Sequence, residues 1–300
     1  MIEVRVPATT ANMGTGFDSF GMALNLYNTV SVKEIPEGLK IRNFGMGDYV
    51  PTGENNLIYR AMKEVFDCVG YHPGGLSIYQ YSSIPQTRGM GSSSACIIAG
   101  MTAANVMSGR KLDCRQILNL AANMEGHPDN VAPALYGGFC ISMKTDSGVI
   151  CKSIKPKADL RFVAMIPEYY VVTKKSREVL PEQVTLEAAA HNLARASAFA
   201  AAMVTGRYDD LREFADDRLH QPYRASYINR MYDIFDKGYE LGAKAMYLSG
   251  SGPTIMAVTG KNTRELVDGM KGFFSANEMS YHIRILSADN VGTVVKYKNC

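Results

Sequence analysis

A loop rich in glycine and serine is the stretch of this chain best suited to bind an anion. It reads Ile84-Pro-Gln-Thr-Arg-Gly-Met-Gly-Ser-Ser-Ser-Ala95 and separates a strand-like run, 76–81, from a run of small apolar residues, 96–107. The second run predicts a buried helix that Gly109 closes. A glycine loop that leads from a strand into a helix aims backbone N–H groups and the helix dipole at one anion.

Several side chains of this loop suit such a site. Gly89 and Gly91 permit the positive φ angles and close approach that an anion loop needs. The serines at 92–94 could cap the helix and leave one hydroxyl for a metal or a phosphate. Arg88 adds a positive charge, and no Asp or Glu lies between residues 84 and 105. The alternative is a capped glycine turn that binds nothing.

The spacing of the loop excludes two common nucleotide motifs. A Walker A loop requires Lys after its second glycine, and here Gly91 is followed by Ser92. A dinucleotide fingerprint requires Gly-x-Gly-x-x-Gly, and Ser94 occupies the third glycine position. A nucleotide site at this loop must therefore be of another type.

Five further stretches also gather polar or charged groups. Each could instead be an ordinary turn or a solvated charged surface. The five stretches are the glycine-rich loop 7–24 with Asn12 and Asp18, the segment 125–134 with Glu125, His127 and Asn130, the basic segments 173–181 and 218–224 with Arg177 and Arg224, and the turn 249–254.

The composition describes an ordinary soluble globular protein. The chain has 300 residues, of which 46% are hydrophobic and 20% charged. A net charge of +3, without a basic cluster interleaved with aromatics, argues against nucleic-acid binding. The six cysteines form no Cys-x2-Cys pair and are expected to be reduced. With no signal peptide and no run of 18 apolar residues, we expect a cytoplasmic protein without membrane contact.

The polar segments resemble the superfamily of galactokinase, homoserine kinase, mevalonate kinase and phosphomevalonate kinase. Residues 85–93 are similar to its phosphate loop, with Met90 where Leu is usual, and 249–254 is similar to its third motif. Residues 7–21 and 125–134 are similar to homoserine kinases in particular, although Met13 and Thr15 depart from the usual Leu and Pro. The basic segments 173–181 and 218–224 also resemble homoserine kinase motifs, so the resemblance extends from Val4 to Val258 through six segments in family order.

This resemblance implies an ATP-dependent kinase that phosphorylates the hydroxyl of L-homoserine, with Mg²⁺, in threonine biosynthesis, and forms a homodimer. The implied ATP-binding residues are Pro85, Arg88, Gly89, Met90, Gly91, Ser92, Ser93 and Ser94, and the implied Mg²⁺ ligands are Ser93 and Glu125. The implied substrate-binding residues are Asn12, Asp18, His127, Asn130, Arg177, Arg224 and Gly250. The implied catalytic residues are Asp18, Asn130, Thr173 and Arg177.

The charges of a zwitterionic amino acid fit this set. Asp18 is the candidate for its ammonium group, and Arg177 and Arg224 are the candidates for its carboxylate. Mevalonate and galactose relatives carry a catalytic Asp at the position of Asn130, and an amide accepts no proton at neutral pH. We therefore hypothesise that no side chain acts as base, with Asp18 as the alternative. A kinase for mevalonate or a sugar and a non-catalytic metabolite sensor are the rival functions.

The order of predicted elements favours an α+β fold of two domains. The resemblance implies that residues 1–155 form a ribosomal-protein-like α/β domain that binds ATP. Within it, 26–33 and 38–43 are predicted to form a hairpin. Residues 156–300 would form a ferredoxin-like domain of order β-α-β-β-α-β. Its predicted helices are 182–206, 208–219, 225–241 and 263–276, and 292–297 is a candidate last strand.

Overall fold

The computed structural model describes residues 1–45, 50–156, 160–171 and 173–298, and of residues 173–175 it describes the backbone alone. The first half contains β1 (Ile2–Ala11), β2 (Phe20–Ile35), β3 (Gly38–Gly45), α1 (Leu57–Val69), β4 (Gly75–Ser82), α2 (Ser92–Met107), α3 (Cys114–Glu125), α4 (Val131–Tyr136), β5 (Phe139–Thr145) and β6 (Gly148–Ile154). The second half contains β7 (Arg161–Pro167), α5 (Thr173–Glu178), α6 (Leu186–Thr205), α7 (Leu211–Phe214), α8 (Gln221–Arg224), a 3-10 turn (Ala225–Tyr227), α9 (Met231–Glu240), β8 (Ala245–Leu248), β9 (Ile255–Thr259), α10 (Arg264–Ala276), β10 (Tyr281–Leu286) and β11 (Val294–Tyr297).

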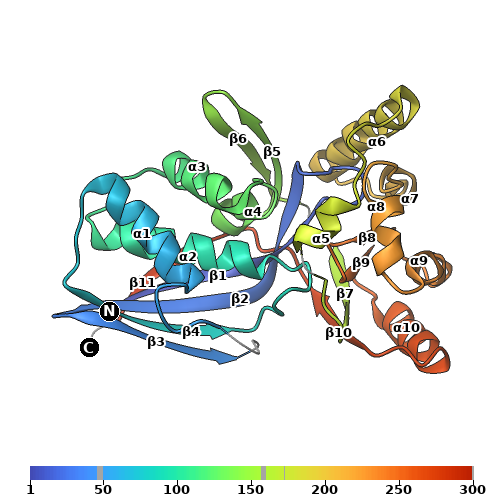
Figure 1. The fold of residues 1–300 in the computed structure, drawn as a ribbon. Helices are drawn as coiled ribbons and strands as arrows, with labels where there is room; N and C mark the ends of the chain where they lie inside the picture. The colour runs from blue at the N-terminus through green and yellow to red at the C-terminus, as the bar shows by residue number, and fades with distance from the viewer. Residues whose placement is uncertain (46–49, 157–159, 172, 299–300) are drawn as a thin grey trace.

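A seven-stranded sheet forms the base of the first half, and helices α1 to α4 cover one of its faces (Figure 1). The strand order is β11-β1-β2-β4-β3, and β5 pairs with β2 and with β6. Helix α2 lies at the centre of this layer and is buried from Ser94 to Asn105. The small residues of this helix allow close packing against its neighbours, so the predicted buried helix is confirmed.

The predicted hairpin of residues 26–33 and 38–43 is wrong. Both runs are strands, but β4 lies between them, antiparallel to β2 and parallel to β3. At the start of β4, a Cβ on Gly74 would lie 2.5 Å from the carbonyl oxygen of Pro36, and one on Gly75 would lie 2.4 Å from the carbonyl carbon of Glu37. These two glycines therefore let β4 enter at the turn that joins β2 to β3.

The second sheet confirms the ferredoxin-like prediction. Its order, β10-β7-β9-β8, with helices between β7 and β8 and between β9 and β10, is the ferredoxin-like arrangement. Successive residues of β7 point to opposite faces: Val163 and Met165 pack under α9 and α10, whereas Phe162 and Ala164 join the core of the first half. The predicted helices 208–219 and 225–241 are too long, because the chain forms the short α7, α8 and a 3-10 turn before α9.

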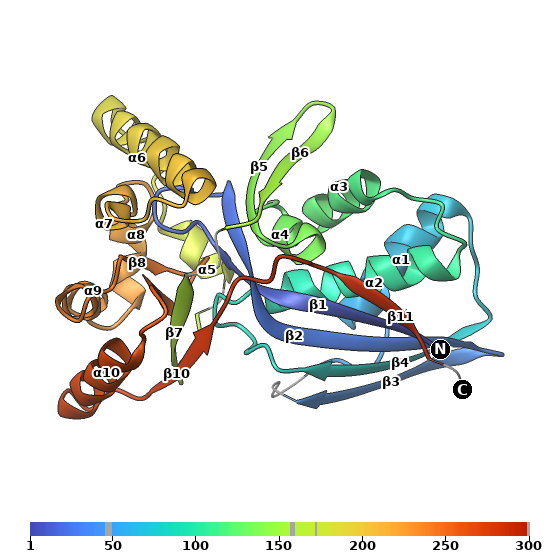
Figure 2. The same cartoon turned by 180° about the vertical axis from the view of Figure 1, so that it is seen from behind.

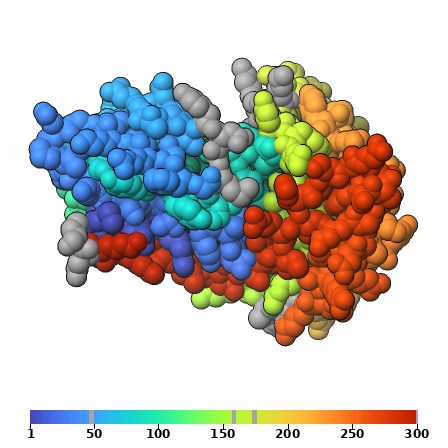
Figure 3. Space-filling model, turned by 90° about the horizontal axis from the view of Figure 1, so that it is seen from below, coloured from blue at the N-terminus to red at the C-terminus, as the bar shows by residue number. Residues whose placement is uncertain are grey.

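The chain returns to the first sheet at its end, as Figure 2 shows. Strand β11, which the sequence predicted as a candidate, pairs antiparallel with β1, Ile2 opposite Tyr297. The red atoms near the C-terminus therefore lie among the dark blue atoms of the N-terminus in Figure 3.

The predicted boundary between two domains, at residues 155 and 156, stays a prediction. No helix among the described residues is long and apolar enough to span a membrane.

Candidate active site

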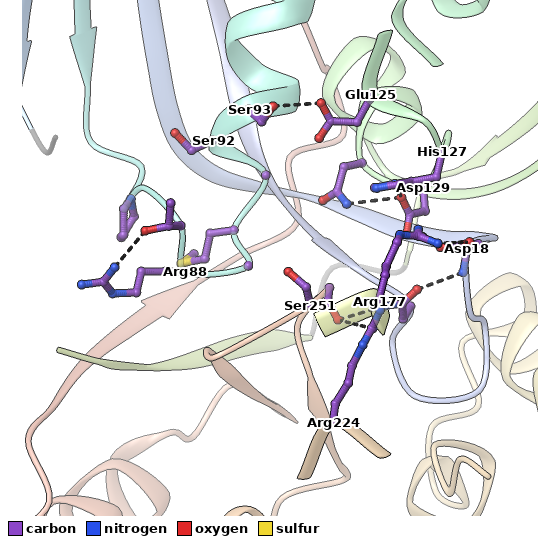
Figure 4. Close-up of a pocket in the computed structure, with 18 residues that line it drawn as sticks. Asp18, Arg88, Ser92, Ser93, Glu125, His127, Asp129, Arg177, Arg224 and Ser251 are labelled. Carbon is purple, nitrogen blue, oxygen red and sulfur yellow. Dashed lines mark hydrogen bonds and ion pairs between the residues drawn. The ribbon is translucent and has the colours of Figure 1, made fainter. Parts of the chain in front are cut away.

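A pocket lies where the glycine loop 84–95 meets the turn 249–254 of the second half (Figure 4). Its lining combines segments from both halves of the chain. Of the residues predicted from the sequence, the lining includes Asn12, Asp18, Pro85, Arg88, Gly89, Met90, Gly91, Ser92, Ser93, Glu125, His127, Asn130, Arg177, Arg224 and Gly250. The pocket also contains three residues that the sequence analysis did not single out, Thr87, Asp129 and Ser251.

The loop adopts the backbone conformation predicted for its two glycines. Gly89 and Gly91 have φ angles of +74° and +69°. A Cβ on Gly91 would lie 1.9 Å from Thr9 Oγ1, and one on Gly89 would lie 2.2 Å from the carbonyl oxygen of Ser249. The loop is thus packed between β1 and the turn 249–254, and both glycines are required by geometry as well as by φ.

The serines that follow do not cap helix α2, contrary to one prediction. The N-cap is Gly91, without a side-chain cap. The hydroxyls of Ser93 and Ser94 instead donate to Glu125 Oε2 and Oε1, at 2.9 and 3.1 Å. Because the N-cap residue is a glycine and offers no side-chain acceptor, the first-turn N–H groups of α2 are left to backbone or ligand acceptors. Ser94 is fully buried and is not among the residues that line the pocket, so its role in ATP binding stays a prediction.

Arg88 joins the loop to the second sheet. Its guanidinium donates to the carbonyl oxygens of Pro167, at 3.1 Å, and Glu168, at 2.5 Å, at the end of β7. In Figure 4 this side chain points away from Ser92 and Ser93. The positive charge predicted for the loop therefore lies at the pocket rim.

Charged side chains face one another at the opposite end of the pocket. The Arg177 guanidinium donates to Asp18 Oδ2 and Oδ1 at 3.1 and 2.7 Å. The Asp18 N–H donates to Asn12 Oδ1, and Asn12 Nδ2 donates to the carbonyl oxygen of Gly250 at 3.0 Å. Asp18, with φ of +53°, sits in a conformation that is uncommon for residues other than glycine. Loop 12–18 is thereby fixed to the turn at Gly250.

Arg224 is buried beside this pair. Its Nε donates to the carbonyl oxygen of Ser176 at 3.3 Å and its Nη1 to that of Gly250 at 2.9 Å. Burial, together with the nearby charge of Arg177, lowers the pKa of Arg224 to about 10. Arg224 is therefore still charged at neutral pH, in a place where an anionic ligand would relieve its desolvation.

The segment after α3 adds a carboxylate, that of Asp129, to which the sequence analysis assigned no role. Asp129 Oδ1 lies 2.5 Å from His127 Nδ1 and accepts from Asn130 Nδ2 at 3.3 Å. Burial opposes protonation of His127, but the hydrogen bond and charge of Asp129 outweigh it, and the pKa of His127 is raised. Thr9 Oγ1 donates to Asn130 Oδ1 at 2.7 Å, which fixes the orientation of that amide. In the sequence, Asp129 was marked only by its place between the candidate site residues His127 and Asn130.

Thr173 is the remaining predicted residue. It begins helix α5, which also carries Arg177, but its side chain lies outside the described residues. Its role therefore stays a prediction.

Comparisons with known proteins identify relatives of the whole chain. A family model of the GHMP kinases N terminal domain matches residues 56–138, and a model of the GHMP kinases C terminal region matches 198–274. A homoserine kinase of Clostridium beijerinckii is 41% identical over 98% of both chains, and one of Caldicellulosiruptor bescii is 42% identical over 98% of this chain and 97% of its own.

Solved structures agree with these matches. The crystal structure of a homoserine kinase from Cytophaga hutchinsonii superposes with a TM-score of 0.89 and 27% identity, covering 98% of this chain and 97% of that one. A mevalonate kinase from L. major, 15% identical over 95% of each chain, has a TM-score of 0.74 and shares the fold. Both domain models match, and the full-length relatives are more than 40% identical. The chain therefore belongs to the homoserine kinase family of the GHMP kinases.

Proposed function

We propose that this enzyme transfers the γ-phosphoryl group of ATP to the side-chain hydroxyl of L-homoserine, which gives O-phospho-L-homoserine for threonine biosynthesis. The observation that carries the proposal is the charge arrangement along one pocket. The glycine loop 84–95, which leads into the N-terminus of α2, lies at one end, and Asp18, Arg177 and Arg224 lie at the other. The full-length relatives named homoserine kinase support the same substrate.

The substrate end matches both charges of a zwitterionic amino acid. The Asp18 carboxylate would accept from the ammonium group, and the two guanidiniums would hold the carboxylate. Asn12, His127 and Gly250 would line the short carbon chain between them. Mevalonate and sugars carry no ammonium group, so the substrate of a rival sibling kinase would offer Asp18 no cationic donor.

The residues at the ATP end fit a Mg²⁺ ion. Glu125 and the hydroxyl of Ser93 are oxygen donors beside the N-terminus of α2, and Mg²⁺ prefers oxygen ligands of this kind. When bound, the ion would neutralise charge on the transferred phosphoryl group. Ser94 would hold the second carboxylate oxygen of Glu125 and keep its plane fixed.

The mechanism we propose is in-line transfer driven by positioning. The turn at Gly250 and the loop at Gly89 and Gly91 would confine the phosphates, while the charged end holds the substrate so that its hydroxyl faces them. Asn130, buried and held by Thr9, cannot remove a proton. The hydroxyl proton would therefore pass to the γ-phosphate. Turnover lost in Asp18→Asn with homoserine affinity intact would make Asp18 the base and contradict this step.

The proposal is tested by Mg²⁺-dependent ADP release with L-homoserine, D-homoserine, L-threonine, L-serine and mevalonate in parallel. Strong selection for L-homoserine is the expected result. Turnover only with another alcohol would overturn the substrate assignment while leaving the ATP site in place. Absence of transfer to every alcohol, with ATP still bound, would favour the metabolite sensor.

Two further expectations belong to this proposal. A homodimer in the cytoplasm is expected from the resemblance to the family alone. Sedimentation measurements of the purified chain would test the dimer. Since the site combines Asn12, Asp18 and His127 of the first half with Arg177 and Arg224 of the second, each protomer would contain a complete substrate end.

A further inference from the structure

A histidine that does not line the pocket contacts the segments that do. His220 is fully buried, at 0% exposure. Its Nε2 lies 2.8 Å from the carbonyl oxygen of Gly14, in the loop that carries Asn12 and Asp18, and its Nδ1 lies 3.2 Å from Arg224 Nη1. The ring thus lies between the loop of the ammonium candidate and the guanidinium of the carboxylate candidate.

These two contacts settle which ring nitrogen carries the proton. A carbonyl oxygen can only accept, so Nε2 must carry the hydrogen. A guanidinium can only donate, so Nδ1 must present its lone pair. His220 is therefore neutral, and burial lowers its pKa, which favours the same state. Asp217 Oδ2, at 3.5 Å from Nε2, is a further charged group close to the ring, and Asp18 also acts on it by its charge.

The backbone around His220 is fixed independently of the ring. Asp217 accepts from the N–H groups of Leu219, His220 and Gln221 at 2.7 to 3.0 Å. Asn192 Nδ2 donates to the same carboxylate at 2.7 Å. The ring itself stacks on Phe17, with centroids 5.3 Å apart. The position of Nδ1 is consequently set by the fold, and it in turn constrains Arg224.

We propose that His220 is a positioning residue, which acts as hydrogen-bond acceptor for Arg224 and so orients that guanidinium toward the substrate carboxylate. The Nη1 atom of Arg224 is shared between His220 Nδ1 and the carbonyl oxygen of Gly250, and Nε is bound to that of Ser176. With one edge held by these acceptors, the guanidinium can present its remaining donors to an anion in a fixed plane. The role rests on the proposed function.

Two amide variants separate the two contacts of the ring. The amide of His220→Asn can place an oxygen near the position of Nδ1, so it retains an acceptor for Arg224 but loses the donor to Gly14. The longer His220→Gln places its amide near Nε2, so it retains the donor and loses the acceptor. Both variants lose the stacking on Phe17, which makes each the control of the other.

We expect His220→Gln to raise the KM for L-homoserine about tenfold, the effect of one hydrogen bond to a charged group. The KM for ATP should stay within about twofold, and His220→Asn should stay within about threefold of wild type for both substrates. In an Arg224→Met background, His220→Gln should have no further effect on kcat/KM, because its partner is absent. Equal losses in the two amide variants, or additive effects with Arg224→Met, would overturn the proposal.

Histidine ¹⁵N NMR of the full chain gives a readout that does not need the substrate. We expect the neutral Nε2–H form of His220 at pH 7, and a shifted Nδ1 resonance in Arg224→Met. A protonated ring or an Nδ1–H form would overturn the positioning role. Failure of the wild-type enzyme to phosphorylate L-homoserine would instead contradict the proposed function, whatever the NMR shows.

Discussion

Arg177 and Asp18 are bound to each other through two hydrogen bonds of 3.1 and 2.7 Å, at the end of the pocket where a zwitterion is expected. The side chain of Arg177 is 39% exposed and that of Asp18 is 34% exposed. An amino acid can replace this ion pair without loss of charge balance, since its carboxylate would take the place of Asp18 and its ammonium that of Arg177. A ligand with only one of these charges would leave one protein group without a partner.

This exchange predicts strong selection for zwitterions. Removing the charged partner of a buried or half-buried group costs about 1.5–3 kcal/mol, or roughly 10- to 100-fold in affinity. We expect 3-amino-1-propanol and 4-hydroxybutyrate each to lose at least this factor in kcat/KM relative to L-homoserine.

Arg177→Ala should raise the KM for L-homoserine by a similar factor and leave the KM for ATP unchanged. Arg218→Ala, on the exposed surface, is the control. A KM near the wild-type value in Arg177→Ala would contradict the exchange.

The phosphate loop should not tolerate a methyl group at Gly91. Gly91→Ala places a Cβ 1.9 Å from Thr9 Oγ1 and 3.2 Å from Asn130 Oδ1. Because displacement of reacting groups by about 1 Å can cost roughly 100-fold, we expect at least that loss in kcat/KM for ATP. Gly109→Ala is the matched control, since Gly109 also has a positive φ, +87°, but open space around it. It should lose about 1–2 kcal/mol of stability and little activity. Similar activity losses in both variants would mean that φ alone matters.

Glu125 should govern the response to Mg²⁺. We expect Glu125→Gln to require at least tenfold more Mg²⁺ for half-maximal turnover, because a neutral amide is a poorer ligand than a carboxylate. The measurement is a Mg²⁺ titration at saturating ATP and L-homoserine. Glu64→Gln, at an exposed position of α1, should leave the titration unchanged. An unchanged titration in Glu125→Gln would remove this residue from the metal site.

Stability should fall on mild acidification because of His220. Its pKa is lowered by burial, with Arg224 adding to the effect, while Asp217 and Asp18 oppose it. The unfolded chain therefore takes up a proton near pH 6.5, while the folded chain does not. The contribution of His220 is complete above that pH and is lost as the pH falls. We expect the melting temperature of wild type to drop more between pH 7.5 and 5.5 than that of His220→Asn. Parallel drops would show that the ring titrates normally.

The local motifs were predictable because their chemistry lies in short segments. The positive φ angles of Gly89 and Gly91 and the helix that follows could be predicted from residues 84–107 alone, whereas the assignment of a phosphate loop needed the resemblance. Asn12, Asp18, Arg177 and Arg224 came from separate segments, and the resemblance to a family was needed to bring them together. The ferredoxin-like order was predictable because each element carries its own periodicity.

The missed features depend on contacts between distant segments. The hairpin of residues 26–43 was wrong because no local pattern shows that β4 enters between two strands joined by a short turn. The cap predicted for Ser94 was wrong, and its actual partner, Glu125, lies 31 residues away in the chain. Asp129 was overlooked because its two partners, His127 and Asn130, become informative only once their side chains converge on its carboxylate.

The pairing of β11 with β1 makes the two ends of the chain neighbours. The N–H of Lys298 donates to the carbonyl oxygen of Met1 at 3.0 Å, and the Lys298 ammonium pairs with Glu3. A fragment that stops near residue 155 would leave the outer edge of β1 without hydrogen-bond partners, and such an edge can recruit other chains. Conversely, a short peptide linker between the ends would close the backbone into a ring, so that new termini could be opened at an exposed loop such as Asp146–Gly148.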